Sequence, residues 1–323
     1  MKKVGSFLIL AACFFVCSQN LSAQPSPVVD QPYLLIPPSG ENVWLNPVWS
    51  PDGQSLAFTS GQYIGLWVAR ADGSAVKQIS SAEGAGFGFS WSADSKTILV
   101  RPSVFRSMRR FQSVELIDAE TGHSKVLVEP SRGIRSVPQW AHRDQHVAVV
   151  INEELQLLES GKAPLGRPVI EPENPVLFPV EGKLYRAIAG QKDPSALVDF
   201  EQQTIFNVSY SPDGGRLAFQ VAARGLFVMN LNGSDLKNLG WGERPCWTPD
   251  GKYLVVMITS DDGHRMTKGD LYAIDQASGA EHLLTGHTSI IALSPSVSPD
   301  GRRIAFENPE DGGIYVLELT QGL

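Results

Sequence analysis

The chain is 323 residues long and acidic, with 34 Asp and Glu against 27 Lys and Arg and a formal net charge of −7. Proteins that bind nucleic acid usually present a basic surface to its phosphates, so this balance argues against a nucleic-acid partner. A chain of this length also exceeds what one hydrophobic core usually supports. It should therefore divide into several packing units, which makes internal repeats the first signal to examine.

The first 23 residues have the three parts of a secretory signal peptide. Lys2 and Lys3 form a basic start, residues 7–16 are apolar, and Ala23 ends a small-residue cleavage site. We expect cleavage near Ala23 and a periplasmic or secreted mature protein. The apolar run is too short to anchor the chain in a bilayer, and no later run is long enough, so no membrane span is expected.

Two of the three cysteines, Cys13 and Cys17, lie in this predicted signal peptide. The mature chain then keeps Cys246 alone, so no intramolecular disulfide can form and packing must hold the fold together. Lipidation at Cys17 is an alternative to simple cleavage, although the preceding Phe15-Val16 do not supply the small side chains that this processing favours.

A ten-residue pattern recurs along the rest of the chain. Residues 49–58 read Trp-Ser-Pro-Asp-Gly-Gln-Ser-Leu-Ala-Phe, and full copies occur at 210–219, 247–256 and 297–306, with weaker copies at 91–95 and 140–144. Pro presets the first corner of a type I turn, Asp bonds to the backbone two residues on, and Gly takes the left-handed position. Alternating apolar residues on both sides predict the two strands of a hairpin.

Each good copy continues into a third strand, a second turn and a fourth strand, as in residues 66–74 and 226–234. A four-stranded unit of 40–50 residues is typical of a propeller blade. The interval from Trp140 to Tyr210 is too long for one blade and contains a degenerate copy at 175–186. Counting that copy predicts seven blades, and omitting it predicts six.

The last unit ends after its third strand, at 313–319, and residues 33–37 offer the missing strand from the other end of the chain. The sequence therefore predicts an all-β fold, a closed β-propeller of four-stranded antiparallel blades whose ring is closed by an amino-terminal strand. We expect a signal peptide at 1–23, an amino-terminal segment with the closing strand at 24–45 and the propeller domain at 46–323.

These motifs, above all Trp-Ser-Pro-Asp-Gly followed by Leu-Ala-Phe and then residues 66–74, resemble the WD-like propeller repeat of the TolB family. The resemblance covers about residues 46–319. It implies a periplasmic protein that binds another protein through one face of the ring, in the manner of the periplasmic component of the Tol-Pal envelope system. From this sequence we expect no counterpart of the small amino-terminal α/β domain of TolB, and the TolB propeller has six blades.

Catalytic motifs are not evident in the sequence. It contains no Gly-x-Ser-x-Gly, and His142 and His146 are four residues apart but lie in a predicted turn, where this spacing does not bring two rings together. Asp261-Asp262-Gly263 begins like a calcium loop, but the oxygen ligands that should follow are missing. We therefore expect no enzyme activity, no catalytic or metal-ligating residues and no cofactor.

The most distinctive feature is a cluster of arginines in an acidic chain. In a propeller, the second-to-third strand loop and the blade-to-blade loop emerge on the same face, so arginines from the second blade and from the loop after it should share one edge. Phe105 and Met108 lie among them, a composition that is enriched in protein interfaces. An exposed Trp241 lies in another blade-to-blade loop. The predicted partner-binding residues are Arg101, Phe105, Arg106, Met108, Arg109, Arg110, Arg132, Arg135 and Trp241.

Two functions follow from these observations. The first is a monomeric, periplasmic or secreted scaffold that binds an envelope protein through the arginine-bearing face. The alternative is a propeller lyase or hydrolase acting on acidic glycans, with arginines holding the carboxylates and His264, His282 or His287 moving protons or binding metal. Catalysis would require several titratable side chains to converge near the ring axis, whereas a binding scaffold would not.

Overall fold

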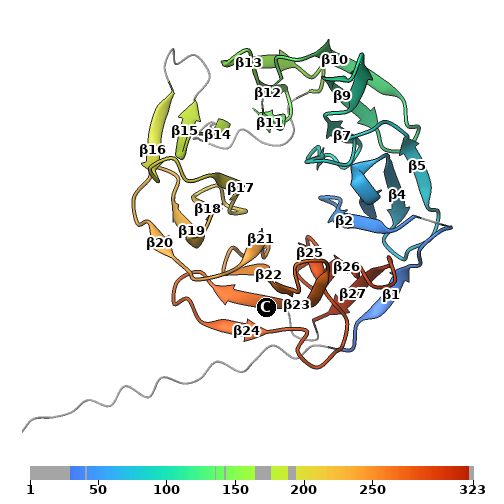
Figure 1. The fold of residues 1–323 in the computed structure, drawn as a ribbon, viewed down its shortest axis with the longest axis vertical. Coiled ribbons are helices and arrows are strands. Elements are labelled where there is room, and N and C mark those ends of the chain that lie inside the picture. The colour runs from blue at the N-terminus through green and yellow to red at the C-terminus, as the bar shows by residue number, and fades with distance from the viewer. Residues whose placement is uncertain are drawn as a thin grey trace, which may run out of the picture.

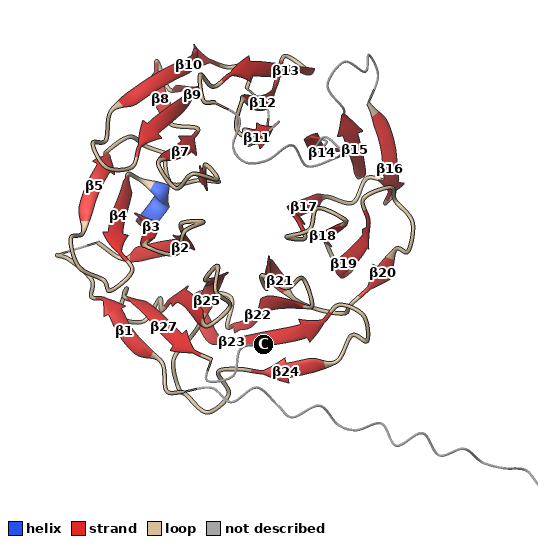
Figure 2. Ribbon diagram, turned by 180° about the vertical axis from the view of Figure 1, so that it is seen from behind, coloured by secondary structure: helices blue, strands red, loops and turns tan. Residues whose placement is uncertain are grey.

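A computed structural model describes residues 30–40, 42–134, 136–141, 143–163, 176–187 and 194–319. Seven antiparallel sheets surround a common axis, and in each sheet the innermost strand is the one that precedes the first turn of the repeat (Figures 1 and 2). The predicted all-β propeller and its count of seven blades are confirmed. The predicted signal peptide lies outside the described residues. No helix in the described ranges is long and apolar enough to cross a bilayer.

Blades 1–3 follow one another from the first repeat. Blade 1 includes one short 3-10 helix, η1 (Gly61–Tyr63), and blade 2 includes an additional strand, β8, that pairs with β9. The strands are β2 (Trp44–Trp49), β3 (Ser55–Ser60), β4 (Leu66–Arg70) and β5 (Lys77–Ser80) in blade 1; β6 (Ser90–Trp91), β7 (Thr97–Val100), β8 (Ser103–Arg106), β9 (Arg109–Asp118) and β10 (Ser124–Ser131) in blade 2; and β11 (Gln139–Ala141), β12 (His146–Ile151) and β13 (Glu154–Glu159) in blade 3.

Blades 4–7 complete the ring. Blades 3 and 4 have three strands each among the described residues, and the other five blades have a four-stranded order. The strands are β14 (Val176–Val180), β15 (Lys183–Ala187) and β16 (Ser195–Asp199) in blade 4; β17 (Ile205–Tyr210), β18 (Arg216–Val221), β19 (Gly225–Asn230) and β20 (Lys237–Asn238) in blade 5; β21 (Glu243–Trp247), β22 (Tyr253–Asp261), β23 (Met266–Asp275) and β24 (Glu281–Leu283) in blade 6; and β25 (Leu293–Val297), β26 (Arg303–Glu307), β27 (Ile314–Glu318) and β1 (Tyr33–Ile36) in blade 7.

The turn of the repeat has the predicted chemistry. In blade 1, Asp52 Oδ1 accepts hydrogen bonds from the Ser50 hydroxyl at 2.6 Å and from the Gln54 N–H at 3.0 Å. Gly53 has a φ of +69°, the left-handed conformation that glycine adopts without steric cost. The Ser55 N–H donates to Ser50 Oγ at 2.9 Å and closes the turn. Because these bonds are local, the motif specifies the hairpin wherever it recurs.

The core lies between neighbouring blades. The Leu-Ala-Phe segment after each good turn places one aromatic ring in it, and Phe58, Phe219 and Phe306 are each 0% exposed. Burial of such a side chain contributes about 1.5–3 kcal/mol. Each cluster joins residues of adjacent sheets, so a blade is stabilised by its neighbours and the ring must close.

Ring closure follows the prediction. The amino-terminal strand β1 pairs antiparallel with β27, matching Tyr33 to Val316 and Ile36 to Ile314. Figure 1 shows the blue β1 beside the red β27 at the outer edge of blade 7. Ile36 is 1% exposed and belongs to the cluster between blades 7 and 1. The two ends of the described chain thus complete one sheet.

Candidate functional site: an arginine-rich hairpin on one face of the ring

We call the face with the second-to-third strand loops and the blade-to-blade loops the hairpin face, and the opposite face, with the repeat turns, the turn face. On the hairpin face, blade 2 extends into a β-hairpin formed by β8 and the start of β9, with Val104 opposite Phe111 and Arg106 opposite Arg109. Ser107 and Met108 form its two-residue loop with φ of +49° and +58°. Both residues are left-handed, as the tightest hairpin loops require. The predicted loop is therefore an ordered hairpin.

The tip of this hairpin exposes an unusual amount of apolar surface. Met108 is 97% exposed and Phe105 is 59% exposed. Arg106 lies over the ring of Phe111, with its Cζ 5.5 Å from the ring centroid. The side chains of the tip therefore combine cations with apolar groups, the composition enriched at protein interfaces.

Four of the predicted arginines are exposed on this part of the hairpin face: Arg106, Arg109, Arg110 and Arg132. Within the described ranges, no carboxylate comes within 4.0 Å of any of the four guanidinium groups. Arg110 donates through Nε to Ser103 Oγ at 2.8 Å, which holds its guanidinium against the hairpin. Among the described residues, the positive charge of these four side chains is therefore not balanced by a direct ion pair.

A depression of about 390 Å³ lies between the hairpin and the end of β10. Its lining is Met108, Arg109, Arg110, Gln112, Ser131, Arg132 and Ile134. The three arginines are its charged residues, and the buried Nε2 of Gln112 has no hydrogen-bond acceptor among the described residues. Since these groups donate hydrogen bonds, the depression suits an anionic or carbonyl-bearing group.

Arg101 does not join the exposed cluster. It is only 9% exposed, donates through Nη1 to the Ser136 carbonyl at 2.9 Å and lies 5.5 Å from the Phe87 ring centroid. Burial, and secondarily the nearby Arg110 charge, lower its pKa. Its long side chain reaches inward from the end of β7, so it links blades 2 and 3. Arg135 lies outside the described residues.

Trp241 is exposed but belongs to another part of the ring. It is 65% exposed in the loop between β20 and β21. Figure 1 places these strands across the ring axis from β9 and β10. The hairpin face therefore carries Trp241 and the arginine cluster as two separate features.

The histidines considered for catalysis are all in blade 6. His264 is in the exposed β22–β23 loop, His282 is in the outer strand β24 with its ring 6.0 Å from that of Tyr253, and His287 lies in the following loop. The arginine cluster is in blade 2 and in the loop that follows it. Within the described residues, no group of three or more His, Cys, Asp or Glu side chains has the geometry of a metal site.

Sequence reasoning missed a polar cluster beside the inner strands. Arg244 of β21 donates to Asn46 Oδ1 at 2.9 Å and to the Tyr63 hydroxyl at 3.3 Å, while its backbone N–H donates to Gln220 Oε1 at 2.9 Å. Glu307 is 7% exposed and accepts from the Asn46 N–H. Burial raises the pKa of Glu307, an effect partly offset by its hydrogen bonds and by Arg244.

This cluster depends on a bulge that no sequence motif announces. Asn46, Asn207, Arg244 and Ser294 occupy matching positions in four inner strands, with φ between +50° and +54°. At each position the register of the first two strands shifts. Residues other than glycine rarely adopt this conformation, and a bulge redirects the chain locally. The recurrence becomes visible only when the strands are aligned in space.

The fold and the repeat together define a class, a seven-bladed β-propeller, and its repeat is similar to that of TolB. The chain is 32% identical over 120 residues to a protein TolB homolog of Chlorobium luteolum, a match that covers 35% of this chain and 26% of that relative. No protein-family model matches the chain.

Comparison with solved structures gives further similarities. TolB of Acinetobacter baumannii has 16% sequence identity and a TM-score of 0.49, over 87% of this chain and 64% of that one. Oligogalacturonate lyase of Vibrio parahaemolyticus has 14% identity and a TM-score of 0.57, over 91% and 98%. At such identities the lyase likeness supports the propeller fold alone.

Proposed function

We propose that this chain is a non-catalytic scaffold of the bacterial envelope that binds another protein through the arginine-bearing part of its hairpin face. The observation that carries this proposal is the β8–β9 hairpin, where Met108 is 97% exposed and Arg106 and Arg109 have no carboxylate partner among the described residues. A folded hairpin that exposes both apolar and charged groups is suited to a protein partner.

The charge pattern indicates which kind of partner would bind. The whole chain is acidic, so an acidic partner would be repelled by most of its surface and attracted to the hairpin. Carboxylates of the partner would pair with guanidinium groups at the depression, and its apolar groups would cover Met108 and Phe105. The resemblance to TolB agrees with a periplasmic location and a protein partner.

Capture from envelope extract tests the proposal. The test variant carries Arg106→Glu and Arg109→Glu, and it keeps Arg110 because that side chain is bonded to Ser103. The control carries Lys252→Glu and Arg302→Glu, two exposed cations in repeat turns on the turn face, so the charge change is the same. A stoichiometric partner should bind the wild type and the control and be lost from the test variant. Loss from both variants, or from neither, would refute the assignment of this surface.

A second candidate is a propeller that acts on acidic glycans. The donor-lined depression would also suit the carboxylates of an oligogalacturonide, the substrate class named for the lyase with related fold. Incubation with oligogalacturonides, followed at the wavelength of the unsaturated product, tests this activity with and without divalent metal. Product formation that is lost in the Arg106→Glu, Arg109→Glu variant would favour this candidate over the scaffold.

A further inference from the structure

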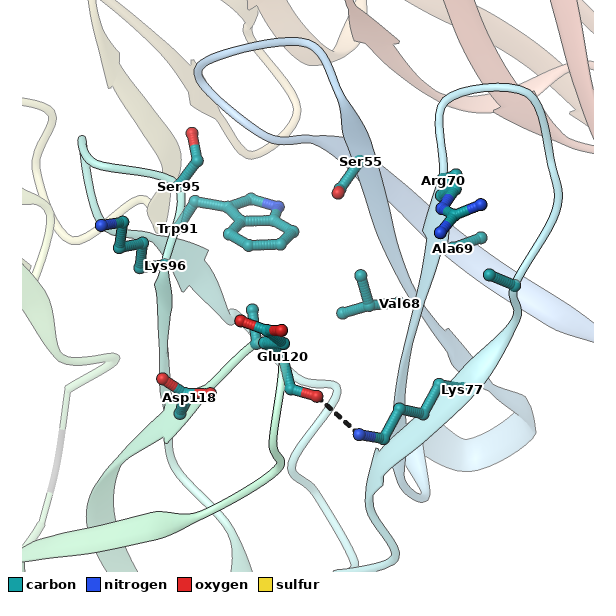
Figure 3. A pocket seen from close by; sticks show the side chains of 12 residues that line it. Ser55, Val68, Ala69, Arg70, Lys77, Trp91, Ser95, Lys96, Asp118 and Glu120 are labelled. Atoms are coloured by element: carbon teal, nitrogen blue, oxygen red, sulfur yellow. Dashed lines mark hydrogen bonds between the residues drawn. The ribbon is translucent and has the colours of Figure 1, made fainter.

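A second concave site lies on the turn face, between blades 1 and 2. This groove has a volume of about 410 Å³. Its lining includes Ser55, Val68, Trp91, Ser95 and Ala119. Figure 3 shows the Trp91 ring between Ser55 and Ser95, with Val68 across the groove from the ring on the Ser55 side. The Trp91 indole N–H donates to the Val48 carbonyl at 3.1 Å, which fixes the ring in the groove wall.

The matching groove between blades 7 and 1 is filled by the protein itself. Arg303, the first residue of β26, lies across Trp49, with its Cζ 4.4 Å from the ring centroid. Its Nη1 donates to the Ala71 carbonyl at 3.2 Å, and its Nη2 approaches the Gly53 carbonyl at 3.5 Å. A guanidinium is thus held by one aromatic face and two backbone carbonyls, the geometry of a cation–π contact with hydrogen bonds.

The groove between blades 1 and 2 repeats the acceptors of that site. Trp91 corresponds to Trp49, Ser95 to Gly53 and Ala119 to Ala71, because each occupies the same place in its blade. The backbone confirms the last correspondence, since Ala71 donates to the Gln54 carbonyl at 2.9 Å and Ala119 donates to the Lys96 carbonyl at 2.9 Å.

What differs is the residue that should fill the groove. Ser55 begins β3 as Arg303 begins β26, and a serine side chain is too short to cross Trp91 or to reach the two carbonyls. Over the described ranges, neither the Ser95 nor the Ala119 carbonyl accepts a hydrogen bond. The groove between blades 1 and 2 therefore has the same acceptors as the groove between blades 7 and 1, but among the described residues it has no counterpart of Arg303.

Two other grooves support the comparison. Between blades 5 and 6, Arg216 extends from the start of β18, donates to the side chain of Gln276 and pairs with Asp235 at 2.7 Å. Between blades 2 and 3, Lys162 pairs with Asp94 at 2.7 Å and donates to Thr97 Oγ1 at 2.9 Å. In both grooves a cation of the chain is held between two blades, and Arg216 has the same place in its repeat as Arg303 and Ser55.

We propose that the groove between blades 1 and 2 is a docking socket for an arginine side chain of a partner protein, which would stack on Trp91 and donate to the Ser95 and Ala119 carbonyls. This surface is on the opposite face from the arginine hairpin, so the proposal does not rest on the function of that hairpin.

The rim of the socket carries both signs of charge and does not by itself select a ligand. The charged residues of the lining are Asp118, Glu120, Arg70, Lys77 and Lys96, and Lys77 Nζ donates to the Glu120 carbonyl at 2.5 Å (Figure 3). The floor is selective, because a π face and carbonyl oxygens attract a cation and repel a carboxylate. Of the charged side chains, arginine also has the planar fork that can reach two acceptors at once.

The test follows the Trp91 indole N–H signal by NMR in the ¹⁵N-labelled protein, assigned with a Trp91→Phe variant. The probe is the peptide acetyl-Gly-Arg-Gly-amide at millimolar concentration. Two control peptides replace arginine by citrulline, which has the same shape without the charge, or by glutamate. We expect a saturable shift of the Trp91 signal with the arginine peptide and a several-fold smaller one with either control.

Two variants make the result specific to the socket. Ser55→Arg should fill the groove from within the chain and abolish the shift, whereas Ser55→Ala should retain it. The other indole signals report whether each variant is folded. Equal shifts with arginine and citrulline, a larger shift with glutamate, or undiminished binding by a folded Ser55→Arg variant would overturn the proposal.

Discussion

Arg244 of blade 6 and Asn46 of blade 1 are joined directly by a hydrogen bond of 2.9 Å, although blade 7 lies between them in the ring. The two residues are 198 positions apart in the chain. The guanidinium also reaches Tyr63, and the buried Glu307 of blade 7 accepts from the Asn46 N–H. Three consecutive blades therefore share one polar cluster at the seam where the ring closes.

Replacement of Arg244 should weaken this seam. Arg244→Met keeps most of the side-chain length but removes both hydrogen bonds and the positive charge near Glu307. Bonds that involve charged groups contribute about 1.5–3 kcal/mol, so we expect a loss of that order in the free energy of unfolding, measured by urea denaturation. The exposed Arg302→Met should change the same quantity by less than about 0.5 kcal/mol. Equal effects would show that the cluster does not stabilise the ring.

Glu307 should make the stability of the protein depend on pH. Burial raises its pKa in the folded state above the ordinary value of 4.5, so the native state holds the proton more tightly than the unfolded state. The contribution of this group to stability is therefore complete below about pH 4.5 and falls as the pH rises through the folded pKa. Glu307→Gln keeps the shape and an acceptor for the Asn46 N–H.

We expect the Glu307→Gln variant to lack this part of the pH dependence and to be at least as stable as the wild type at pH 8. Unfolding by urea from pH 4.5 to 8 measures both curves. Parallel curves, with the variant less stable throughout, would mean that the carboxylate is favourable in the folded protein and that the direction of the pKa shift is wrong.

The closing strand β1 should be essential to the whole ring. Ile36 is 1% exposed between blades 7 and 1, and truncation of a buried isoleucine costs about 2–5 kcal/mol. Ile36→Ala should therefore lower the thermal midpoint of the entire propeller. Leu34→Ala, in the same strand but 44% exposed, is the matched control and should have a small effect. If Ile36→Ala lowered the thermal midpoint of only a minor part of the unfolding transition, ring closure would not couple the blades.

The repeat turn offers a more local prediction. Asp213 accepts the Ser211 hydroxyl at 2.5 Å and the Gly215 N–H at 3.0 Å, and these bonds lower its pKa below 3.8. Its contribution is then present above pH 3.8 and is lost as the pH falls through the lowered value. Asp213→Ala should cost about 0.5–1.5 kcal/mol at pH 7. A double-mutant cycle with Ser211→Ala should show the two losses to be less than additive.

Much of the architecture could be predicted from the sequence, because its causes are local. The Ser-Pro-Asp-Gly turn is closed by side-chain and backbone bonds within six residues, so each copy predicts a hairpin wherever it stands. The degenerate copy at 175–186 was enough to predict blade 4, since an alternating apolar run around Glu181-Gly182 keeps the same pattern. The closing strand was predictable because the last unit has three strands and residues 33–37 supply the missing one.

The candidate sites could be predicted only in part, because their residues come together from different blades. The sequence predicted that the arginines share one face, but it could not show that Arg101 is buried against the ring of Phe87 while Met108 is exposed at a hairpin tip. Nor could it show that Ser55 leaves open the position that Arg303 fills across Trp49.

The sequence by itself determined the turn chemistry, the strand pattern and the means of closing the ring, whereas the choice between six and seven blades came from the tertiary structure. Only the tertiary structure decided which side chains of one blade lie against the next: Arg244 reaches Asn46, whereas no cation among the described residues stacks on Trp91 as Arg303 stacks on Trp49. The physical reason is that each turn is stabilised by residues that are neighbours in the chain. A site between blades instead depends on the length and direction of side chains that are a full blade or more apart in the sequence.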